Sequence, residues 1–152
     1  MTVGAFCSRI VVFVGEDEDV VEAAKLMRSR HTGSVDVVRN ADRGAYDPVG
    51  MLTDRDLVVE VLAQEVDAQS VRVKDVMSSE PVVAHEQDSL YDTLKRMRAR
   101  GVRRVPVTTD DGQIVGVLSV DDAISLLASE LNDIDALIVN EQEREREMRS
   151  AR

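Results

Sequence analysis

The chain has 152 residues, 43% of them hydrophobic and 32% charged, which fits one globular domain or two small ones that share a core. Its net charge of -10 repels polyphosphate backbones and anionic lipid surfaces, so neither nucleic acid nor a membrane is expected as a partner. A single cysteine, no run of about 18 apolar residues and no basic, apolar N-terminal signal favour a soluble cytoplasmic protein without disulfides.

Taken in chain order, the first half predicts a βαββα unit. An apolar segment at 9–14 leads through acidic residues into residues 20–30, where Val20, Ala24 and Met27 have the spacing of one buried helix face. The remaining expected elements are a strand at 34–38, an Asp- and Gly-rich turn at 40–47, a strand at 48–52 and a helix at 54–63.

The second half predicts the same elements again. They are expected at 80–85, 90–100, 104–108, 113–118 and 120–131, with a turn at 109–112. A shift of 70 positions sets VVEAAKLMRSR against LYDTLKRMRAR, and after four extra residues in the first turn a shift of 66 aligns Gly50 and Asp56 with Gly116 and Asp122. Neither copy alone can bury its apolar faces well, so we expect the two to pack around a pseudo-two-fold axis.

Each copy opens its second helix with a hydroxyl and an acid three positions apart. The motifs are GMLTDRD at 50–56 and GVLSVDD at 116–122. This spacing is that of a helix capping box, in which each side chain accepts a hydrogen bond from a terminal backbone N–H. It also suits a nucleoside phosphate, because the helix N-terminus with Thr53 or Ser119 can hold a phosphate, and Asp56 or Asp122 can accept a ribose diol. Both interpretations remain open from the residues alone.

These motifs, the doubled βαββα unit and the stretch VRRVPVTTDDGQIVGVLSVDDAISLL resemble a tandem of CBS domains, the pair called a Bateman module. The resemblance implies an α/β (α+β) fold with repeats at 1–64 and 73–130, a linker at 65–72 and a C-terminal helical extension at 131–152. It also implies two clefts between the repeats that bind adenosine-containing nucleotides. The first copy departs from the pattern, since Asp36 stands where the second copy has Pro106 and its turn is longer.

In similar modules each cleft takes its hydroxyl and acid from one repeat and its adenine walls from the other. Carried over by position, one cleft combines Met51, Thr53 and Asp56 with Met77, Val82, Val102 and Arg103. The other combines Val117, Ser119 and Asp122 with Cys7, Val12, Thr32 and Gly33. Arg103, Arg104 and, less strongly, Arg55 are the expected phosphate contacts. The first repeat has Gly33 and Ser34 at the positions of Arg103 and Arg104, so the two clefts are expected to tolerate different charge.

The last 22 residues differ from both repeats. Apolar residues at helical spacing give way to the charged segment EQEREREMRSAR, which predicts an amphipathic helix that covers the module or buttresses a homodimer. No catalytic constellation and no metal-ligand spacing is present in the sequence, so we expect no enzyme activity and no metal site.

The expected function is regulatory. The module would sense AMP, ADP, ATP or NAD and signal to an unknown effector protein. S-adenosylmethionine and cyclic dinucleotides remain open as ligands. The alternative function is a constitutive dimeric scaffold without a ligand, in which the two motifs act only as helix caps.

Overall fold

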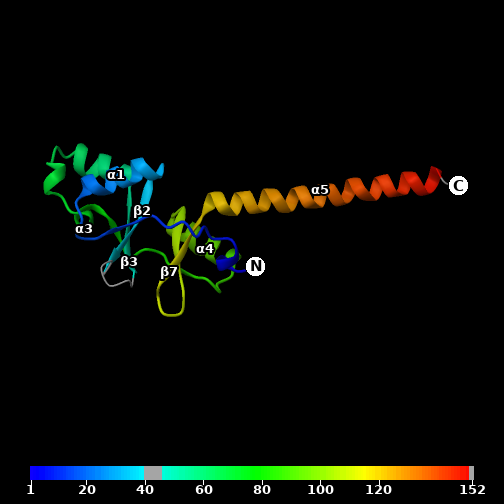
Figure 1. Cartoon of the computed structure of the whole chain (residues 1–152), viewed down its shortest axis with the longest axis horizontal. Helices are drawn as coiled ribbons and strands as arrows, with labels where there is room; N and C mark the ends of the chain where they lie inside the picture. Colours follow the sequence, from blue (N-terminus) through cyan, green and yellow to red (C-terminus); the bar gives the residue numbers. More distant parts are fainter. Residues whose placement is uncertain (40–45, 151–152) are drawn as a thin grey trace.

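The computed structural model describes residues 1–39 and 46–150, so the turn expected at 40–47 lies largely outside the described residues. Two sheets lie side by side, helices cover them, and one long helix extends away from the body (Figure 1). The chain has a mixed α+β fold. No helix among the described residues is long and apolar enough to cross a membrane.

The first sheet has the strand order β1-β2-β3-β4. Its strands are β1 (Phe13–Gly15), β2 (Ser34–Arg39), β3 (Asp47–Thr53) and β4 (Ser78–Ser79). β1 runs parallel to β2, and the other two pairings are antiparallel. The second sheet has the order β5-β6-β7, with strands β5 (Ala84–His85), β6 (Arg104–Thr108) and β7 (Ile114–Ser119). It repeats the parallel and then antiparallel pairing. The strands predicted at 34–38, 48–52, 104–108 and 113–118 are therefore confirmed to within a residue or two.

The first helix of each repeat has the same length and the same ends. α1 (Val20–Arg30) and α4 (Leu90–Arg100) begin with a side-chain cap from Asp19 or Ser89 to the backbone N–H three residues on. Both end at a residue with positive φ. Met27 and Met97 are buried at equivalent positions. The predicted ranges are confirmed, but the buried face of α1 consists of Val20, Ala23 and Met27 and leaves the expected Ala24 exposed, since Ala23 and Ala24 fit the helical spacing equally well.

Short helical turns complete the body. The second helix of repeat one is α2 (Asp54–Asp56), which continues as the π-helical segment η3 (Leu57–Leu62). The 3-10 turn η1 (Val3–Ala5) opens the first repeat, the 3-10 turn η4 (Ala68–Ser70) lies between the repeats, and α3 (Val73–Val76) opens the second one. The second helix of repeat two is α5 (Val120–Ser150), whose 31 residues include the predicted extension.

The first segment of each repeat packs on the other repeat. Val3 and Cys7 belong to the core built by the second sheet, whereas Val73 belongs to the core built by the first. Ser8 bridges to Val117 on β7 through two backbone hydrogen bonds of 2.9 Å, and β4 pairs with β3 in the corresponding way. The two repeats are therefore interlocked, and the space between them is shared.

A glycine permits each of these crossings. A Cβ on Gly116 would lie 2.6 Å from the Cys7 sulfur and 2.7 Å from the Ser8 carbonyl oxygen. A Cβ on Gly50, at the equivalent position, would lie 2.6 Å from the Met77 sulfur and 2.7 Å from the Ser78 carbonyl oxygen. Only a residue without a side chain allows the crossing segment to approach this closely. The glycine of each quoted motif thus has a packing role.

Candidate functional site

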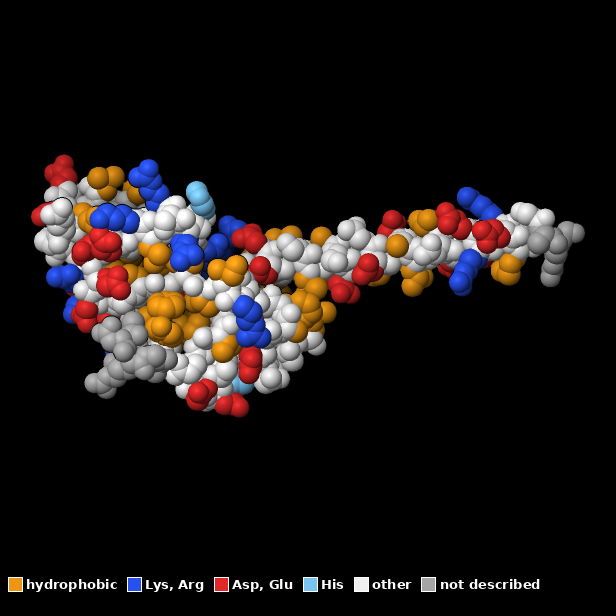
Figure 2. Space-filling model, viewed as in Figure 1, with side chains coloured by type: hydrophobic (Ala, Val, Ile, Leu, Met, Phe, Trp, Pro, Cys, Tyr) orange, Lys and Arg blue, Asp and Glu red, His pale blue; other side chains and the backbone are white. Residues whose placement is uncertain are grey.

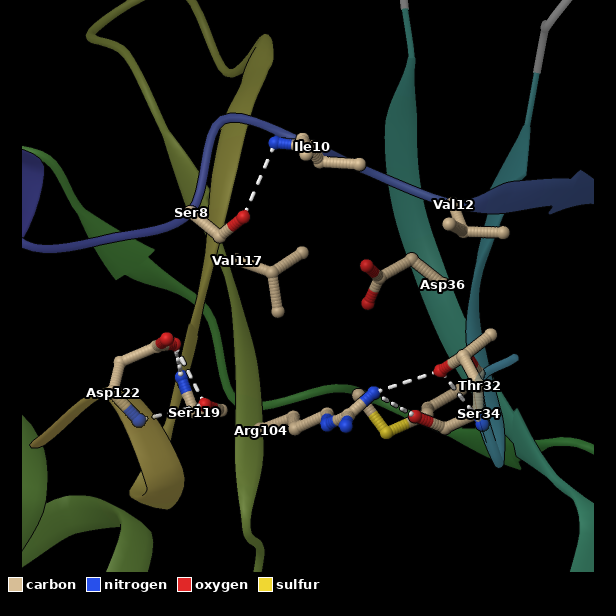
Figure 3. A pocket seen from close by; sticks show the side chains of 11 residues that line it. Ser8, Ile10, Val12, Thr32, Ser34, Asp36, Arg104, Val117, Ser119 and Asp122 are labelled. Carbon is tan, nitrogen blue, oxygen red and sulfur yellow. Dashed lines mark hydrogen bonds between the residues drawn. The ribbon is translucent and has the colours of Figure 1, made fainter. Parts of the chain in front are cut away.

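A cavity of about 310 Å³ lies between the repeats beside Ser119, and we call it the Ser119 cleft. It is lined by Ser8, Ile10, Val12, Thr32, Ser34, Asp36, Met51, Arg104, Val117, Ser119 and Asp122. Val117, the capping pair and Ser8 stand on one side, and Val12, Thr32, Ser34 and Asp36 of the first repeat stand on the other (Figure 3). The size is at the lower end of the range for small-molecule sites, and the lining mixes aliphatic side chains with a few polar groups, as ligand sites do.

In the wall of this cleft, Ser119 and Asp122 form a closed capping arrangement. Oδ2 of Asp122 accepts hydrogen bonds from the backbone N–H of Ser119 at 2.9 Å and from its hydroxyl at 2.6 Å. The Ser119 hydroxyl accepts in turn from the Asp122 N–H at 3.1 Å. Both contacts to the carboxylate use Oδ2, so Oδ1 of Asp122 is left for a further donor. Capping and ligand binding are therefore compatible at one carboxylate.

Thr53 and Asp56 repeat this geometry in the first copy. Oδ2 of Asp56 accepts from the Thr53 N–H at 2.8 Å and from its hydroxyl at 2.7 Å, and the Asp56 N–H donates to that hydroxyl at 3.1 Å. The same atoms are used in both copies. The repeated motif thus builds the same local structure twice.

A second hollow, the Thr53 cleft, adjoins the Ser119 cleft and shares Ser34, Met51 and Arg104 with it. Its volume is about 910 Å³, so it is larger than the Ser119 cleft. It is lined by Gly33, Ser34, Met51, Thr53, Asp54, Arg55, Ser78, Ser79, Glu80, Pro81, Val82, Arg100, Gly101, Val102, Arg103, Arg104 and Asp121. Four arginines face three acids here, whereas the Ser119 cleft has one arginine and two acids. The two clefts therefore differ in charge. The Thr53 cleft is the more basic one, as the asymmetry of the repeats predicts.

Most of the residues assigned to the clefts from sequence line them. Those that line the Ser119 cleft are Val12, Thr32, Val117, Ser119 and Asp122. Those that line the Thr53 cleft are Met51, Thr53, Val82, Val102, Arg103, Arg104 and Arg55. The structure thus brings together residues from both repeats in each cleft.

Four assigned residues lie elsewhere. Gly33 faces the Thr53 cleft and not the Ser119 cleft. Cys7 and Met77 lie behind the cleft walls against the motif glycines, where burial raises the pKa of the Cys7 thiol. Asp56 is held against Thr53 and is not part of the cleft lining. What these residues do for a ligand stays a prediction.

Sequence reasoning missed Ser8, Ile10, Ser34 and Asp36 of the Ser119 cleft. The first two lie on the crossing segment, whose position depends on contacts more than 100 residues away along the chain. Asp36 was detectable, because it is where the first repeat departs from the Pro106 of the second. A polar residue at an otherwise apolar strand position was the signal.

Asp36 lies in the middle of β2 and is only 4% exposed. Its backbone N–H donates to the Val12 carbonyl at 3.0 Å, which fixes the strand. Oδ1 of its side chain is buried and has no hydrogen-bond partner among the described residues, and the carboxylate points across the cleft toward Val117 (Figure 3). Burial raises the pKa of Asp36 to about 7, against a lowering effect of the Arg104 guanidinium.

Arg104 joins the two repeats. Its Nη1 donates to the hydroxyls of Thr32 and Ser34, each at 3.0 Å. It lines both clefts, as do Ser34 and Met51. Arg103, the neighbouring position, is by contrast 78% exposed and lies 3.6 Å from Asp121. A change at Arg104 therefore reaches both clefts at once.

Related sequences match most of the chain. Uncharacterized protein MK0525 of Methanopyrus kandleri is 33% identical over 83% of this chain, which spans 62% of that protein's length. The CBS domain-containing protein YhcV of Bacillus subtilis is 34% identical over 79% of this chain and 81% of its own.

Solved structures share the fold. Hypoxic Response Protein I with two coordinated zinc ions gives a TM-score of 0.71 at 29% identity, over 82% of this chain and 98% of that one. PAE2072 of Pyrobaculum aerophilum complexed with AMP gives 0.70 at 23%, over 80% and 89%. The CBS domain pair of MJ0100 in complex with 5′-methylthioadenosine and S-adenosyl-L-methionine gives 0.72 at 22%, over 86% and 98%. The family model of the CBS domain matches residues 3–63 and 73–129, so this chain belongs to the CBS domain family and contains two copies of the domain.

Proposed function

We propose that this chain is a regulatory module that binds an adenine nucleotide, of the group AMP, ADP, ATP and NAD, in the clefts between its two CBS domains. The observation that carries the proposal is the pair of Ser119 and Asp122 in the wall of the Ser119 cleft, where the second repeat presents a hydroxyl and a carboxylate with one uncommitted oxygen to residues of the first repeat. Thr53 and Asp56 form the same pair beside the Thr53 cleft, to whose lining Thr53 belongs. A ligand that spans the cleft contacts both repeats and can favour one relative arrangement of them.

The parts of a nucleotide match the parts of the Ser119 cleft. Oδ1 of Asp122 is available for a ribose hydroxyl, since Oδ2 alone makes the capping contacts. Ser119 stands at the N-terminus of a 31-residue helix, where backbone dipoles favour a phosphate. Val12 and Val117 from opposite walls offer aliphatic surfaces for a flat base. The chain has few aromatic residues, so a base is held between valines and not stacked on rings.

The Thr53 cleft suits a more highly charged ligand. Four arginines line it: Arg55, Arg100, Arg103 and Arg104. One guanidinium group can donate two parallel hydrogen bonds to the oxygens of a phosphate. Its larger volume leaves room for additional phosphates. We infer that this cleft takes the di- or triphosphate when both forms are present, and the Ser119 cleft the monophosphate.

Two similar structures support an adenosine-containing ligand. One is complexed with AMP, and the other with 5′-methylthioadenosine and S-adenosyl-L-methionine. The adenine base and its ribose diol are the parts that these three molecules share. The Ser119 cleft has a carboxylate for the ribose and aliphatic surfaces for the base, from Asp122, Val12 and Val117.

The output of the module requires a partner. α5 begins inside the second domain and continues beyond it. Beyond Ala123 and Leu126, this helix is exposed, and Leu131, Ile134 and Ile138 follow one another at the three- and four-residue spacing of a helix seam. Figure 2 shows hydrophobic side chains interspersed with charged ones along this arm. We infer that α5 pairs with a second copy, so that ligand binding alters dimer geometry and thereby a separate effector protein.

The alternative is a constitutive dimeric scaffold. Both capping boxes are closed by contacts within the chain, which is what this alternative requires. It gives no role, however, to the buried and unpartnered Asp36 oxygen at the wall of the Ser119 cleft. We therefore prefer the sensor.

Isothermal titration with AMP, ADP, ATP and NAD tests the proposal, preceded by mass spectrometry of the purified protein for nucleotides that remain bound. We expect at least one of them to bind. At 100 times its dissociation constant, that nucleotide should raise the free energy of unfolding by about 2.7 kcal/mol, which a thermal shift detects. If all four leave the unfolding temperature unchanged at millimolar concentration and none is released on denaturation, the scaffold is the better description.

A further inference from the structure

We propose that Asp36 is the specificity residue of the Ser119 cleft, where its carboxylate accepts a hydrogen bond from the exocyclic amino group of a 6-aminopurine base. This inference rests on the proposed function, since it names the group by which that cleft distinguishes one nucleotide from another. Position 36 departs from the residue at the same place in the second domain, so the recognition belongs to this cleft alone.

The carboxylate is placed to meet a ligand. Only 4% of Asp36 is exposed, yet its carboxylate lies in the cleft wall and points into the cavity (Figure 3). A buried carboxylate oxygen without a partner carries a desolvation cost that protein structures rarely leave unmatched. In the part of the chain that the structure describes, Asp36 also takes part in no ion pair. A donor supplied by a ligand satisfies it.

The position within the cleft selects which donor this is. Ser119 and Asp122 stand on the wall opposite Asp36, with Val117 between them and the cavity centre (Figure 3). A nucleotide whose ribose and phosphate lie against that pair extends its base toward β2. The 6-amino group is the one N–H donor on the adenine ring of a nucleotide, and it lies on the edge away from the sugar. In this orientation adenine therefore places its 6-amino group at the wall that contains Asp36.

Charge supports the same assignment. The charged groups that line this cleft are Asp36 on β2, Arg104 on β6 and Asp122 on α5. Arg104 Nη1 is engaged by Thr32 and Ser34, so the guanidinium lowers the pKa of Asp36 from a distance without covering it. An amino group that donates to Asp36 favours its ionised form. Aminopurine binding should consequently release a proton near neutral pH and strengthen as the pH rises from 6 to 8.

Two nucleotides that differ only in this group test the inference. AMP carries the amino group, and purine riboside 5′-monophosphate lacks it. We would titrate each into protein labelled with ¹³C at the valine methyl groups, with Val12 and Val117 reporting the Ser119 cleft and Val82 and Val102 the Thr53 cleft. The variants are Asp36→Val, which puts an apolar, β-branched side chain of similar size in the strand, and Asp36→Asn, which keeps an acceptor oxygen but removes the charge.

In the unaltered protein we expect the Ser119 cleft to prefer AMP by about tenfold or more, the range of a hydrogen bond to a charged group. Asp36→Val should reduce this preference to within about threefold, and Asp36→Asn should give an intermediate value. The preference at the Thr53 cleft should be the same in all three proteins, which provides the internal control. Because both nucleotides carry the same phosphate, the ratio of their affinities also isolates the titration of Asp36 from that of the ligand.

Other outcomes overturn the inference in distinguishable ways. Equal affinity of the two nucleotides for the Ser119 cleft, or a preference that survives Asp36→Val, rejects the role of Asp36 while the proposed nucleotide binding stands. Binding confined to the Thr53 cleft does the same. If neither nucleotide shifts any of the four methyl signals at millimolar concentration, the inference and the proposed function fail together.

Discussion

Arg104 donates a hydrogen bond at 3.0 Å to the hydroxyl of Ser34, the residue that the 70-position repeat places at the equivalent point of the first domain. The contact therefore joins a position to its own counterpart across the pseudo-two-fold relation of the two domains. Arginine at both positions would bring two like charges together, whereas Ser34 offers a hydroxyl acceptor. Arg104 lines both clefts, so this contact couples them, and their difference in charge comes from Arg55, Arg100 and Arg103, which line the Thr53 cleft alone.

Arg104→Met should weaken the junction between the domains. Methionine keeps the apolar length of the side chain but removes both hydrogen bonds, to Thr32 and to Ser34. We expect the free energy of unfolding to fall by about 1 to 2 kcal/mol in a denaturant titration. The matched control is Arg103→Met, whose exposed side chain makes only a 3.6 Å contact with Asp121 and should change stability by less than about 0.5 kcal/mol. Equal losses from the two variants would contradict the junction role.

Asp122→Asn and Asp56→Asn should each weaken AMP binding at one cleft and leave the other cleft unchanged. The amide retains an acceptor for the capping contacts but withdraws the charge available to a ribose diol. We expect each variant to reduce the stoichiometry of AMP binding measured by titration calorimetry from two sites to one. Asp133→Asn, on the exposed part of α5, serves as the control and should leave both sites intact. Two undiminished sites in either cleft variant would remove the carboxylate from the binding model.

Asp36 should make the stability of the free protein depend on pH. Its folded pKa of about 7 lies above the ordinary value of 3.8, so the folded state holds a proton that the unfolded chain has lost between these values. Stability from this source is greatest below pH 4, falls as the pH rises and levels above about 7, for a total on the order of 4 kcal/mol.

Denaturant titrations at pH 5 and pH 8 measure this effect. Between them the unaltered protein should lose about 2 to 3 kcal/mol that Asp36→Val does not lose. The comparison cancels all other titrating groups, because both proteins contain them. Parallel pH profiles for the two proteins would show that Asp36 has an ordinary pKa.

Gly116→Ala should detach the N-terminal crossing segment. The added Cβ meets the Cys7 sulfur at 2.6 Å and the Ser8 backbone at 2.7 Å, and the backbone cannot turn away as a flexible side chain can. We expect a loss of about 1 to 3 kcal/mol in unfolding free energy, with faster amide exchange at Ser8. Gly33→Ala is the control, because its nearest neighbour at 3.0 Å is the mobile end of the Asp54 side chain. A native-like exchange rate at Ser8 in Gly116→Ala would contradict this role.

Removal of residues 132–152 should convert a dimer into a monomer. The described part of this segment is exposed throughout and contributes nothing to either core, so the two domains should remain folded. We expect sedimentation velocity to give the coefficient of a single subunit at micromolar concentration, whereas the full chain sediments as a dimer. An unchanged association state, after correction for the lost mass, would place the subunit contact on the domains themselves.

The elements of this protein were largely readable because each repeat is locally consistent. The spacing of apolar residues, the acidic caps and the glycine-containing turns predicted α1, α4 and four strands close to their observed bounds. The helix face of α1 was less accurate, because whether Ala23 or Ala24 is buried depends on how the helix is rotated against its sheet. Burying an alanine side chain changes the free energy of folding only a little, so the spacing of apolar residues did not distinguish Ala23 from Ala24. The packing of the helix against its sheet decided between them.

The sequence by itself determined the two βαββα repeats, the capping geometry open to Thr53 with Asp56 and to Ser119 with Asp122, and the helical character of the C-terminal extension. These depend on hydrogen bonds and periodicities that span a few residues. Only the tertiary structure decided that Ser8 lies on β7, that Arg104 reaches Ser34 and that Asp36 is buried without a partner in a shared cleft. These relations connect positions 70 or more residues apart or depend on what covers a side chain, and no local pattern of residues specifies them.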